Sequence, residues 1–245
     1  MKRLLLSTFL SLTLSIPAYA GDNDINMKRF PSEQELFGDL IRDLGTAMSY
    51  RAVAPAEPLD SPLGIDVGLV VTSSKMKNEL DGWKTATSAN GQDTIYNSEI
   101  HVRKVLPLGF DVGAYFGSVS DSNMKSMGGE IRYAILNDSN LTPALAVRGS
   151  YKAMSGVDDL DLSTAGLELS ISKVVFMAKP YAGLGAIHYE GEGTGIDNYK
   201  FESERDTLAK YFLGVNFDMG PVNFAAEADK TGENSSYKAK FGVRW

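Results

Sequence analysis

The chain contains no cysteine and only two histidines, His101 and His188. It therefore forms no disulfide, and the lack of thiolate ligands together with two distant imidazoles argues against a zinc or other soft-metal site. A protein exported without disulfides needs another source of stability. A closed β-barrel, in which every strand is hydrogen bonded along both edges, is one such source.

Basic residues and long apolar runs are also scarce. Lys and Arg number 24 against 31 Asp and Glu, and the formal net charge is −7. This balance argues against nucleic acid as a partner, because phosphate binding requires clustered cations. Beyond the first twenty residues no segment approaches the roughly 20 apolar residues of a transmembrane helix. If the protein resides in a membrane, a β-barrel is the architecture that can place it there.

Residues 1–20 have the features of a secretory signal peptide. Lys2 and Arg3 provide the positive start, residues 4–16 form a short apolar stretch, and Ala-Tyr-Ala at 18–20 provides the small residues of a cleavage site. The apolar stretch is too short to span a bilayer. The sequence predicts removal of residues 1–20 and a mature chain that starts at Gly21.

Residues 21–63 form an N-terminal segment with a pattern of its own. Ser32 and Glu35 are spaced as in a capping box, and apolar residues at helical spacing predict a helix over 32–45 that ends at Gly45. Its apolar face consists of Leu36, Phe37, Leu40, Ile41 and Leu44. A Pro-rich linker with Pro55, Pro58 and Pro62 follows and favours extended backbone.

The role of this helix is constrained by its charge, which is mostly acidic: Glu33, Glu35, Asp39 and Asp43 against Arg42. Acidic residues argue against docking on anionic lipid, so a helix on the membrane surface is disfavoured. The remaining expectations are a plug in the lumen of the barrel or a cap at its periplasmic end.

Residues 64–245 alternate between apolar and polar residues with a period of two, which is typical of β-strands. The alternation predicts ten strands, most of about ten residues, and a tilted strand needs about 9–11 residues to cross a bilayer. The predicted strands lie around residues 65–72, 99–103, 108–117, 130–135, 145–152, 165–172, 181–189, 209–218, 222–229 and 237–245. The predicted fold is all-β: a ten-stranded antiparallel transmembrane β-barrel over 64–245, with a short N-terminal helix before it.

The connections between these strands alternate in length. Longer polar loops are expected at 76–94, 119–125, 153–160, 190–204 and 230–235, and shorter turns near 107, 137–140, 173–178 and 218–221. Outer-membrane barrels have this asymmetry, with short turns in the periplasm and longer loops outside the cell. An even number of strands is expected to return both ends of the chain to the periplasmic side.

A soluble lipocalin-like carrier would show the same alternation, so the content of the two faces matters. Charged side chains recur on the polar faces, where they could pair across a lumen: Glu99, Arg103, Asp111, Glu130, Arg132, Arg148, Lys152, Glu168, Lys210, Glu227, Lys238, Lys240 and Arg244. Aromatic residues lie near strand ends on the apolar faces, as an interfacial girdle requires: Phe110, Phe116, Tyr133, Tyr151, Tyr189, Phe217, Phe224 and Tyr237. Both features favour the membrane barrel, and the soluble periplasmic carrier remains an alternative.

The last nine residues resemble the C-terminal signature of small bacterial outer-membrane β-barrel proteins. The matching positions are Tyr237, Ala239, Phe241, Val243 and Trp245, with Trp in place of the commoner terminal Phe. The resemblance implies insertion into the cell outer membrane by the barrel-assembly machinery through Tyr237, Phe241, Val243 and Trp245. It also implies outer-membrane lipid and lipopolysaccharide as surroundings. The stretch 44–69 is similar to proteobacterial exported proteins of unknown function.

Catalytic motifs are few. His101 lies on a polar strand face between Glu99 and Arg103. His188 with Glu190 is the pair in this sequence that most resembles the histidine–carboxylate pair of the omptin-type proteases, which are also ten-stranded. There is no G-x-S-x-G elbow, and the sequence around neither histidine resembles that of outer-membrane lipases. A hydrolase that uses a lumenal or rim histidine remains an alternative.

Acidic loops are the better metal candidates, because hard cations prefer carboxylate oxygens. They comprise Asp158, Asp159 and Asp161 in one loop and Glu190, Glu192, Asp197, Glu202 and Glu204 in another. A solvated surface is favoured for both, because no EF-hand spacing is present. The sequence assigns no catalytic, cofactor-binding or metal-binding residue. It predicts a non-enzymatic outer-membrane barrel that acts as a narrow or closed pore or has a structural or surface-interaction role.

Overall fold

The computed structural model describes residues 21–59, 64–76, 81–87 and 91–245. The predicted signal peptide, residues 60–63 of the linker and parts of the first long loop lie outside the described residues. Within them, ten antiparallel strands form a closed barrel in which each strand pairs with its neighbours in sequence and β1 pairs with β10. Their bounds are β1 Ile65–Lys75, β2 Thr94–Val105, β3 Phe110–Val119, β4 Lys125–Leu136, β5 Ala144–Ser155, β6 Leu160–Ser172, β7 Ala178–Gly193, β8 Glu204–Met219, β9 Val222–Thr231 and β10 Asn234–Arg244.

The barrel closes through the pairing of its first and last strands. Asp66 lies opposite Arg244 and Lys75 opposite Ser235, so the register runs along nearly the whole of β1. Trp245 extends this seam, because its backbone exchanges two hydrogen bonds with Ile65 at 2.9 and 3.1 Å. Closure leaves no open sheet edge, and the predicted all-β fold with ten strands and a short N-terminal helix is confirmed.

The two ends of the barrel differ. At the loop end lie the connections β1–β2, β3–β4, β5–β6, β7–β8 and β9–β10, and at the turn end lie the other four connections and Trp245. Three connections differ clearly from the expected lengths, and one of them, the predicted loop at 153–160, spans only 156–159. The predicted polar loop at 230–235 is a tight turn at 232–233, which Gly232 permits with a φ of +58°, while the predicted short turn at 137–140 spans 137–143.

The outer surface of the barrel is apolar and the inner surface is charged. Leu167 and Leu213 are 62% and 67% exposed, whereas Arg132 and Lys210 are 2% and 1% exposed. Most outward residues of the barrel are aliphatic or aromatic, and a soluble protein does not expose an apolar surface of this extent. A lipocalin-like carrier has the opposite arrangement, with its apolar face inside.

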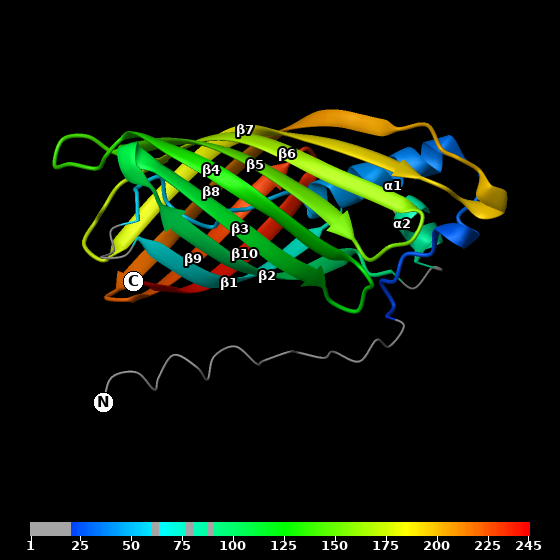
Figure 1. The fold of residues 1–245 in the computed structure, drawn as a ribbon, viewed down its shortest axis with the longest axis horizontal. Coiled ribbons are helices and arrows are strands. Elements are labelled where there is room, and N and C mark those ends of the chain that lie inside the picture. The colour runs from blue at the N-terminus through cyan, green and yellow to red at the C-terminus, as the bar shows by residue number, and fades with distance from the viewer. Residues whose placement is uncertain (1–20, 60–63, 77–80, 88–90) are drawn as a thin grey trace.

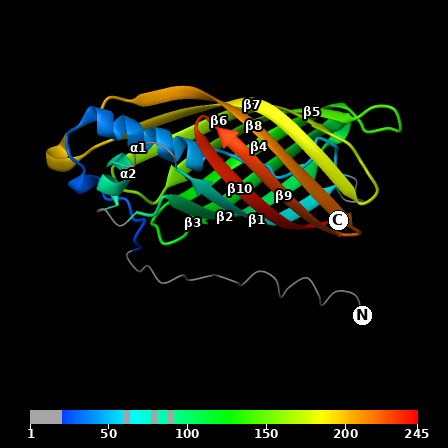
Figure 2. The same cartoon turned by 180° about the vertical axis from the view of Figure 1, so that it is seen from behind.

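The N-terminal segment enters the barrel from the loop end. Helix α1 (Gln34–Ala47) packs against β6, β7, β8 and β10, and the short helix α2 (Asp81–Ala86) of the β1–β2 connection packs against α1. The 3-10 turn η1 (Met27–Arg29) precedes α1, and η3 (Ile196–Asn198) lies in the β7–β8 connection. Figure 1 shows both α-helices at one end of the barrel and the C-terminus at the other, and Figure 2 shows the same arrangement from behind.

Helix α1 begins at Gln34 and ends at Ala47, two residues later at each end than the predicted 32–45. The predicted capping box is not formed, because the residue before the helix is Glu33 and no side chain caps its first turn. Gly45 does not end the helix. Its bare backbone instead lies against the Tyr189 ring, where an added Cβ would approach to 2.7 Å. No helix among the described residues is long and apolar enough to span a bilayer.

The helix lies at the loop end, so the expected cap at the turn end is wrong. Both ends of the barrel, Ile65 and Trp245, lie together at the turn end, as expected for an even number of strands. The first described residues lie instead at the loop end. The backbone N–H of Asn23 donates to Asp121 in the β3–β4 connection (2.9 Å), whereas Trp245 lies at the turn end. Alternation along a strand carries no information on the path of a preceding segment, because that path depends on contacts between residues about a hundred positions apart.

Candidate functional site

The lumen wall is a network of paired charges. Arg103 lies 3.5 Å from Glu130, which lies 2.9 Å from Arg148, and the chain of contacts continues through Glu168 to Lys210 at 3.0 and 2.5 Å. These five residues come from β2, β4, β5, β6 and β8. The predicted pairing of lumenal charges is therefore present, and it joins neighbouring strands as well as strands further apart.

Further pairs complete the wall. Lys238 contacts Glu227 and Asp229 at 2.6 and 3.0 Å, and Lys240 contacts Asp66 at 2.5 Å. Arg132 pairs with Asp111, and Lys152 pairs with Glu99. Among the described residues, the buried wall carries seven acidic and seven basic side chains: Asp66, Glu99, Asp111, Glu130, Glu168, Glu227 and Asp229, and Arg103, Arg132, Arg148, Lys152, Lys210, Lys238 and Lys240. The wall is thus balanced in charge by its own residues.

Residues 49–59, named here the lumen segment, pass from α1 through this lumen to the turn end. Arg51 anchors the upper part: its Nε donates to Asp229 at 3.2 Å and one terminal nitrogen donates to Ser236 Oγ at 3.0 Å. At the lower part the backbone N–H of Glu57 donates to Ser172 Oγ at 3.1 Å, and the Glu57 carboxylate pairs with Lys179.

The wall also binds the backbone of the lumen segment. Lys210 Nζ donates to the Tyr50 carbonyl at 2.9 Å. A single guanidinium nitrogen of Arg132 lies 2.9, 3.2 and 2.9 Å from the carbonyl oxygens of Pro55, Ala56 and Glu57. Two cations of the wall therefore hold four carbonyl groups of the segment.

Apolar contacts fill the remaining space. The Tyr50 ring stacks on Tyr115 with centroids 4.3 Å apart, and Val53 packs with Val70 and Ala225. The cavity beside Ala54 and Arg103 near the turn end has a volume of about 10 Å³. Such a cavity holds about one water at most, so the lumen segment leaves little free space at this height of the lumen.

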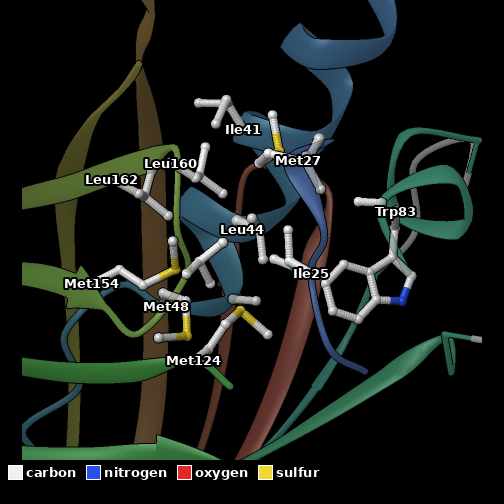
Figure 3. Packing of buried hydrophobic residues seen from close by; sticks show 14 of the residues in the cluster. Ile25, Met27, Ile41, Leu44, Met48, Trp83, Met124, Met154, Leu160 and Leu162 are labelled. Carbon is white, nitrogen blue, oxygen red and sulfur yellow. The ribbon is translucent and has the colours of Figure 1, made fainter. Parts of the chain in front are cut away.

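A hydrophobic cap closes the loop end (Figure 3). Ile25, Met27 and Leu44 of the N-terminal segment meet Trp83 of α2. Residues from the walls and connections complete the cluster: Met76, Ile95, Val119, Met124, Met154, Val157, Leu160, Leu162, Tyr189 and Phe201. The inner face of the barrel is therefore apolar at this height and charged below it.

Tyr189 was predicted to belong to the outer aromatic girdle, and this is wrong. Its side chain is buried inside the cap, where its ring lies against Gly45 of α1. Ile187, two residues earlier on β7, is also buried inside the barrel. The reason is that β7 continues past the charged part of the lumen into the cap, where the inward side must be apolar. The other predicted girdle residues with large exposure, including Phe116, Tyr151 and Tyr237, lie outside.

The two histidines lie on opposite faces of the barrel. His101 is buried in the lumen, 3.0 Å from Glu99 Oε2, and its ring lies 5.6 Å from that of Tyr50. The Ser126 hydroxyl donates to Glu99 at 3.3 Å. His188 is exposed on the outer face, with Nδ1 3.0 Å from Thr207 Oγ1. Within the described part of the chain no carboxylate forms an ion pair with His188, whereas His101 is paired with Glu99.

The acidic loop residues do not converge on a metal site. Among the residues that the structure describes, no three His, Asp or Glu side chains are grouped so that they could hold an ion. Asp161 and Glu192 are neighbours in the β6–β7 register and line a surface hollow of about 440 Å³. Glu204 instead contacts the Gln34 side chain at the start of α1.

Sequence reasoning missed Tyr50 and Arg51 as lumenal residues. The available signal was weak: an aromatic and a basic residue at the start of a stretch that is otherwise rich in Ala and Pro. Their roles depend on partners 160 to 185 positions away along the chain.

Comparisons with known proteins find likeness in structure alone. Neither a family model nor a curated protein sequence matches the chain. The neisserial surface protein A is 12% identical, covers 74% of this chain and 97% of its own length, and has a TM-score of 0.37. Ail of Yersinia pestis is 15% identical over 74% of this chain and 94% of its own, with a TM-score of 0.31. The KdgM porin is 7% identical over 74% and 99%, with a TM-score of 0.38.

At these identities and scores the likeness carries no statement about activity or ligand. The structure itself is that of a bacterial outer-membrane protein: a closed antiparallel barrel with an apolar exterior, a charged interior and an aromatic C-terminal strand.

Proposed function

We propose that this protein is a non-enzymatic, closed outer-membrane barrel that displays its loop-end cap to the outside of the cell. The single observation that supports this best is the lumen segment, which fills the interior between Arg51 and Glu57. A barrel of about eight strands is just filled by its side chains, and here the backbone of a further segment lies among them. The proposed role is structural or surface-interacting.

Conductance in planar lipid bilayers tests the closed state. The intact protein is expected to show no steady conductance, because the lumen segment and the buried side chains around it fill the interior of the barrel. A variant that lacks residues 21–59, once shown to be folded by heat-modifiability on gels, is expected to show a small steady conductance. A large and stable conductance of the intact protein would refute the proposal and favour a porin.

The orientation follows from the rule that short turns face the periplasm. Single cysteines at Ser32 and Asn198, both exposed at the loop end, are expected to react with a membrane-impermeant maleimide on intact cells. A cysteine at Asn140 in the turn-end connection is the matched control and is expected to react only after cell disruption. The natural chain has no cysteine, so background labelling is absent. The reverse pattern would invert the orientation.

A further inference from the structure

The wall of the lumen recognises the lumen segment in part through its backbone. Lys210 binds the Tyr50 carbonyl, and Arg132 lies within 3.2 Å of three further carbonyl oxygens at positions 55–57. Carbonyl groups are common to every peptide. These contacts therefore require an extended chain in the lumen, and they require little of its side chains.

Most side chains of the lumen segment are small, and Tyr50, Arg51 and Glu57 are the large ones. Ala52, Ala54 and Ala56 are all buried, and Ala56 packs against Ala144 and Ala146 of β5. Arg51 precedes these alanines, and its guanidinium contacts Asp229 and Ser236. With the stacked Tyr50 ring, the site thus fits an extended peptide that carries an aromatic residue and an arginine followed by small residues.

The wall keeps its ion pairs without the segment. Asp229 is also bound by Lys238 at 3.0 Å, Lys210 by Glu168 at 2.5 Å, and Arg132 by Asp111. Removal of Arg51 and of the four carbonyl groups therefore leaves each of these charges with a partner of opposite sign. This matters because a buried charge without a partner is strongly destabilising. A wall that is complete by itself is a preformed channel.

The segment is not ideally shaped for its place. Val53 is fully buried with a φ of +48°, a left-handed conformation that is unfavourable for a β-branched residue. A peptide without this strain would bind the same wall more tightly. The N-terminal segment also narrows in one direction, because α1 lies at the loop end and the extended lumen segment continues from it toward the turn end.

From these observations we infer that the lumen is a binding channel for an extended polypeptide, and that the lumen segment is a tethered occupant that such a polypeptide can replace. This inference rests on the closed lumen proposed above and identifies the class of ligand that would compete for it: an unfolded or extended protein segment with an aromatic residue and an arginine followed by small residues.

Cleavage of the folded full-length protein tests the exchange. A protease site is inserted between Leu59 and Gly64, the purified protein is cut in detergent, and heat-modifiability confirms that the barrel remains folded. A synthetic peptide of residues 21–59, labelled with a fluorophore at Gly21, is then added, and its binding is followed by fluorescence anisotropy. The cut barrel is expected to take up the peptide to saturation, and the uncut protein is expected to take up none.

Variant peptides separate recognition from non-specific adsorption. Arg51→Ala is expected to weaken binding at least about tenfold, because charge-assisted hydrogen bonds to Asp229 and Ser236 are lost. Arg29→Ala removes the same charge from an exposed position and is expected to bind like the natural peptide. Val53→Gly is expected to bind at least as tightly as the natural peptide.

Three outcomes would overturn the inference: unfolding of the barrel upon cleavage, no uptake by a cut barrel that is still folded, or equal binding of the Arg51→Ala and Arg29→Ala peptides. None of these depends on conductance of the uncut protein, so failure of the exchange is distinguishable from failure of the closed-barrel proposal.

Discussion

A buried charge in the lumen needs a partner of opposite charge, whereas an outward residue of the same strand needs only to be apolar. Arg132 and Tyr133 illustrate this difference. The Arg132 side chain is 1% exposed, pairs with Asp111 and holds carbonyl groups of the lumen segment. The next residue, Tyr133, points outward, is 40% exposed and contacts the Phe110 ring at 4.8 Å. Adjacent positions of one strand therefore have opposite requirements.

Arg132→Leu is expected to destabilise the barrel by about 3–5 kcal/mol, because Asp111 would remain buried without its partner. Tyr133→Leu is expected to cost about 1 kcal/mol, since it loses one ring contact but stays apolar on a lipid-facing surface. Urea unfolding in detergent compares the two. A larger loss for Tyr133→Leu would mean that the inner and outer faces have been exchanged.

Val53 provides a second test at this scale. Its left-handed φ of +48° disfavours any side chain with a Cβ by about 1–2 kcal/mol. Val53→Gly is therefore expected to be more stable than Val53→Ala by about 1 kcal/mol in urea unfolding, although glycine is ordinarily the less stable residue. The neighbouring Ala54→Gly is the control and is expected to lower stability. If both positions prefer alanine, the backbone at Val53 is not strained.

The cap depends on how closely its elements approach one another. The strands β7 and β8 are the longest of the barrel and continue beside α1 at the loop end. On the other side, α2 lies so close that a Cβ added at Gly82 would approach the Leu36 carbonyl oxygen to 2.6 Å and the Leu40 nitrogen to 2.9 Å. Two helices meet here backbone to backbone, and a side chain at this position would separate them.

Two glycine-to-alanine substitutions in the helices are therefore expected to have opposite effects. Gly82→Ala is expected to loosen the cap and to increase the rate of limited proteolysis in residues 21–47. At Gly38 in α1 an added Cβ meets only the flexible Glu204 side chain at 3.4 Å, so Gly38→Ala is expected to stabilise α1 by up to about 1 kcal/mol. Equal rates of proteolysis in the Gly82→Ala and Gly38→Ala variants would show that α1 and α2 do not touch as described.

Closure of the barrel depends on the pairing of its first strand, β1, with its last strand, β10, and with the end of the chain after β10. Ile65 and Trp245 exchange two backbone hydrogen bonds there. Trp245→Asp places a charge where the terminal aromatic residue meets lipid and is expected to reduce the amount of folded protein in the outer membrane several-fold. Trp245→Phe restores an aromatic end and is expected to assemble like the natural chain. Fractionation followed by heat-modifiability on gels measures both, and normal assembly of Trp245→Asp would contradict this role.

Alternation with a period of two was sufficient to predict ten strands, the outward face of residues such as Leu167 and Leu213, and the inward face of Glu130 and Arg148. The reason is local: successive side chains point to opposite sides of a strand, so each segment carries its own assignment. The count of strands and the C-terminal pattern then predicted a closed barrel of the outer membrane.

Only the tertiary structure decided what lies inside that barrel. The position of α1 at the loop end, the passage of residues 49–59 through the lumen and the inward side of Tyr189 all depend on contacts between distant parts of the chain, such as Arg51 with Asp229. The sequence of a strand shows which of its faces is apolar, but the partner of that face is lipid at some heights and a buried segment at others. Whether lipid or a buried segment lies against the apolar face depends on how the N-terminal segment fills the enclosed space. The alternation within a single strand contains no information about this.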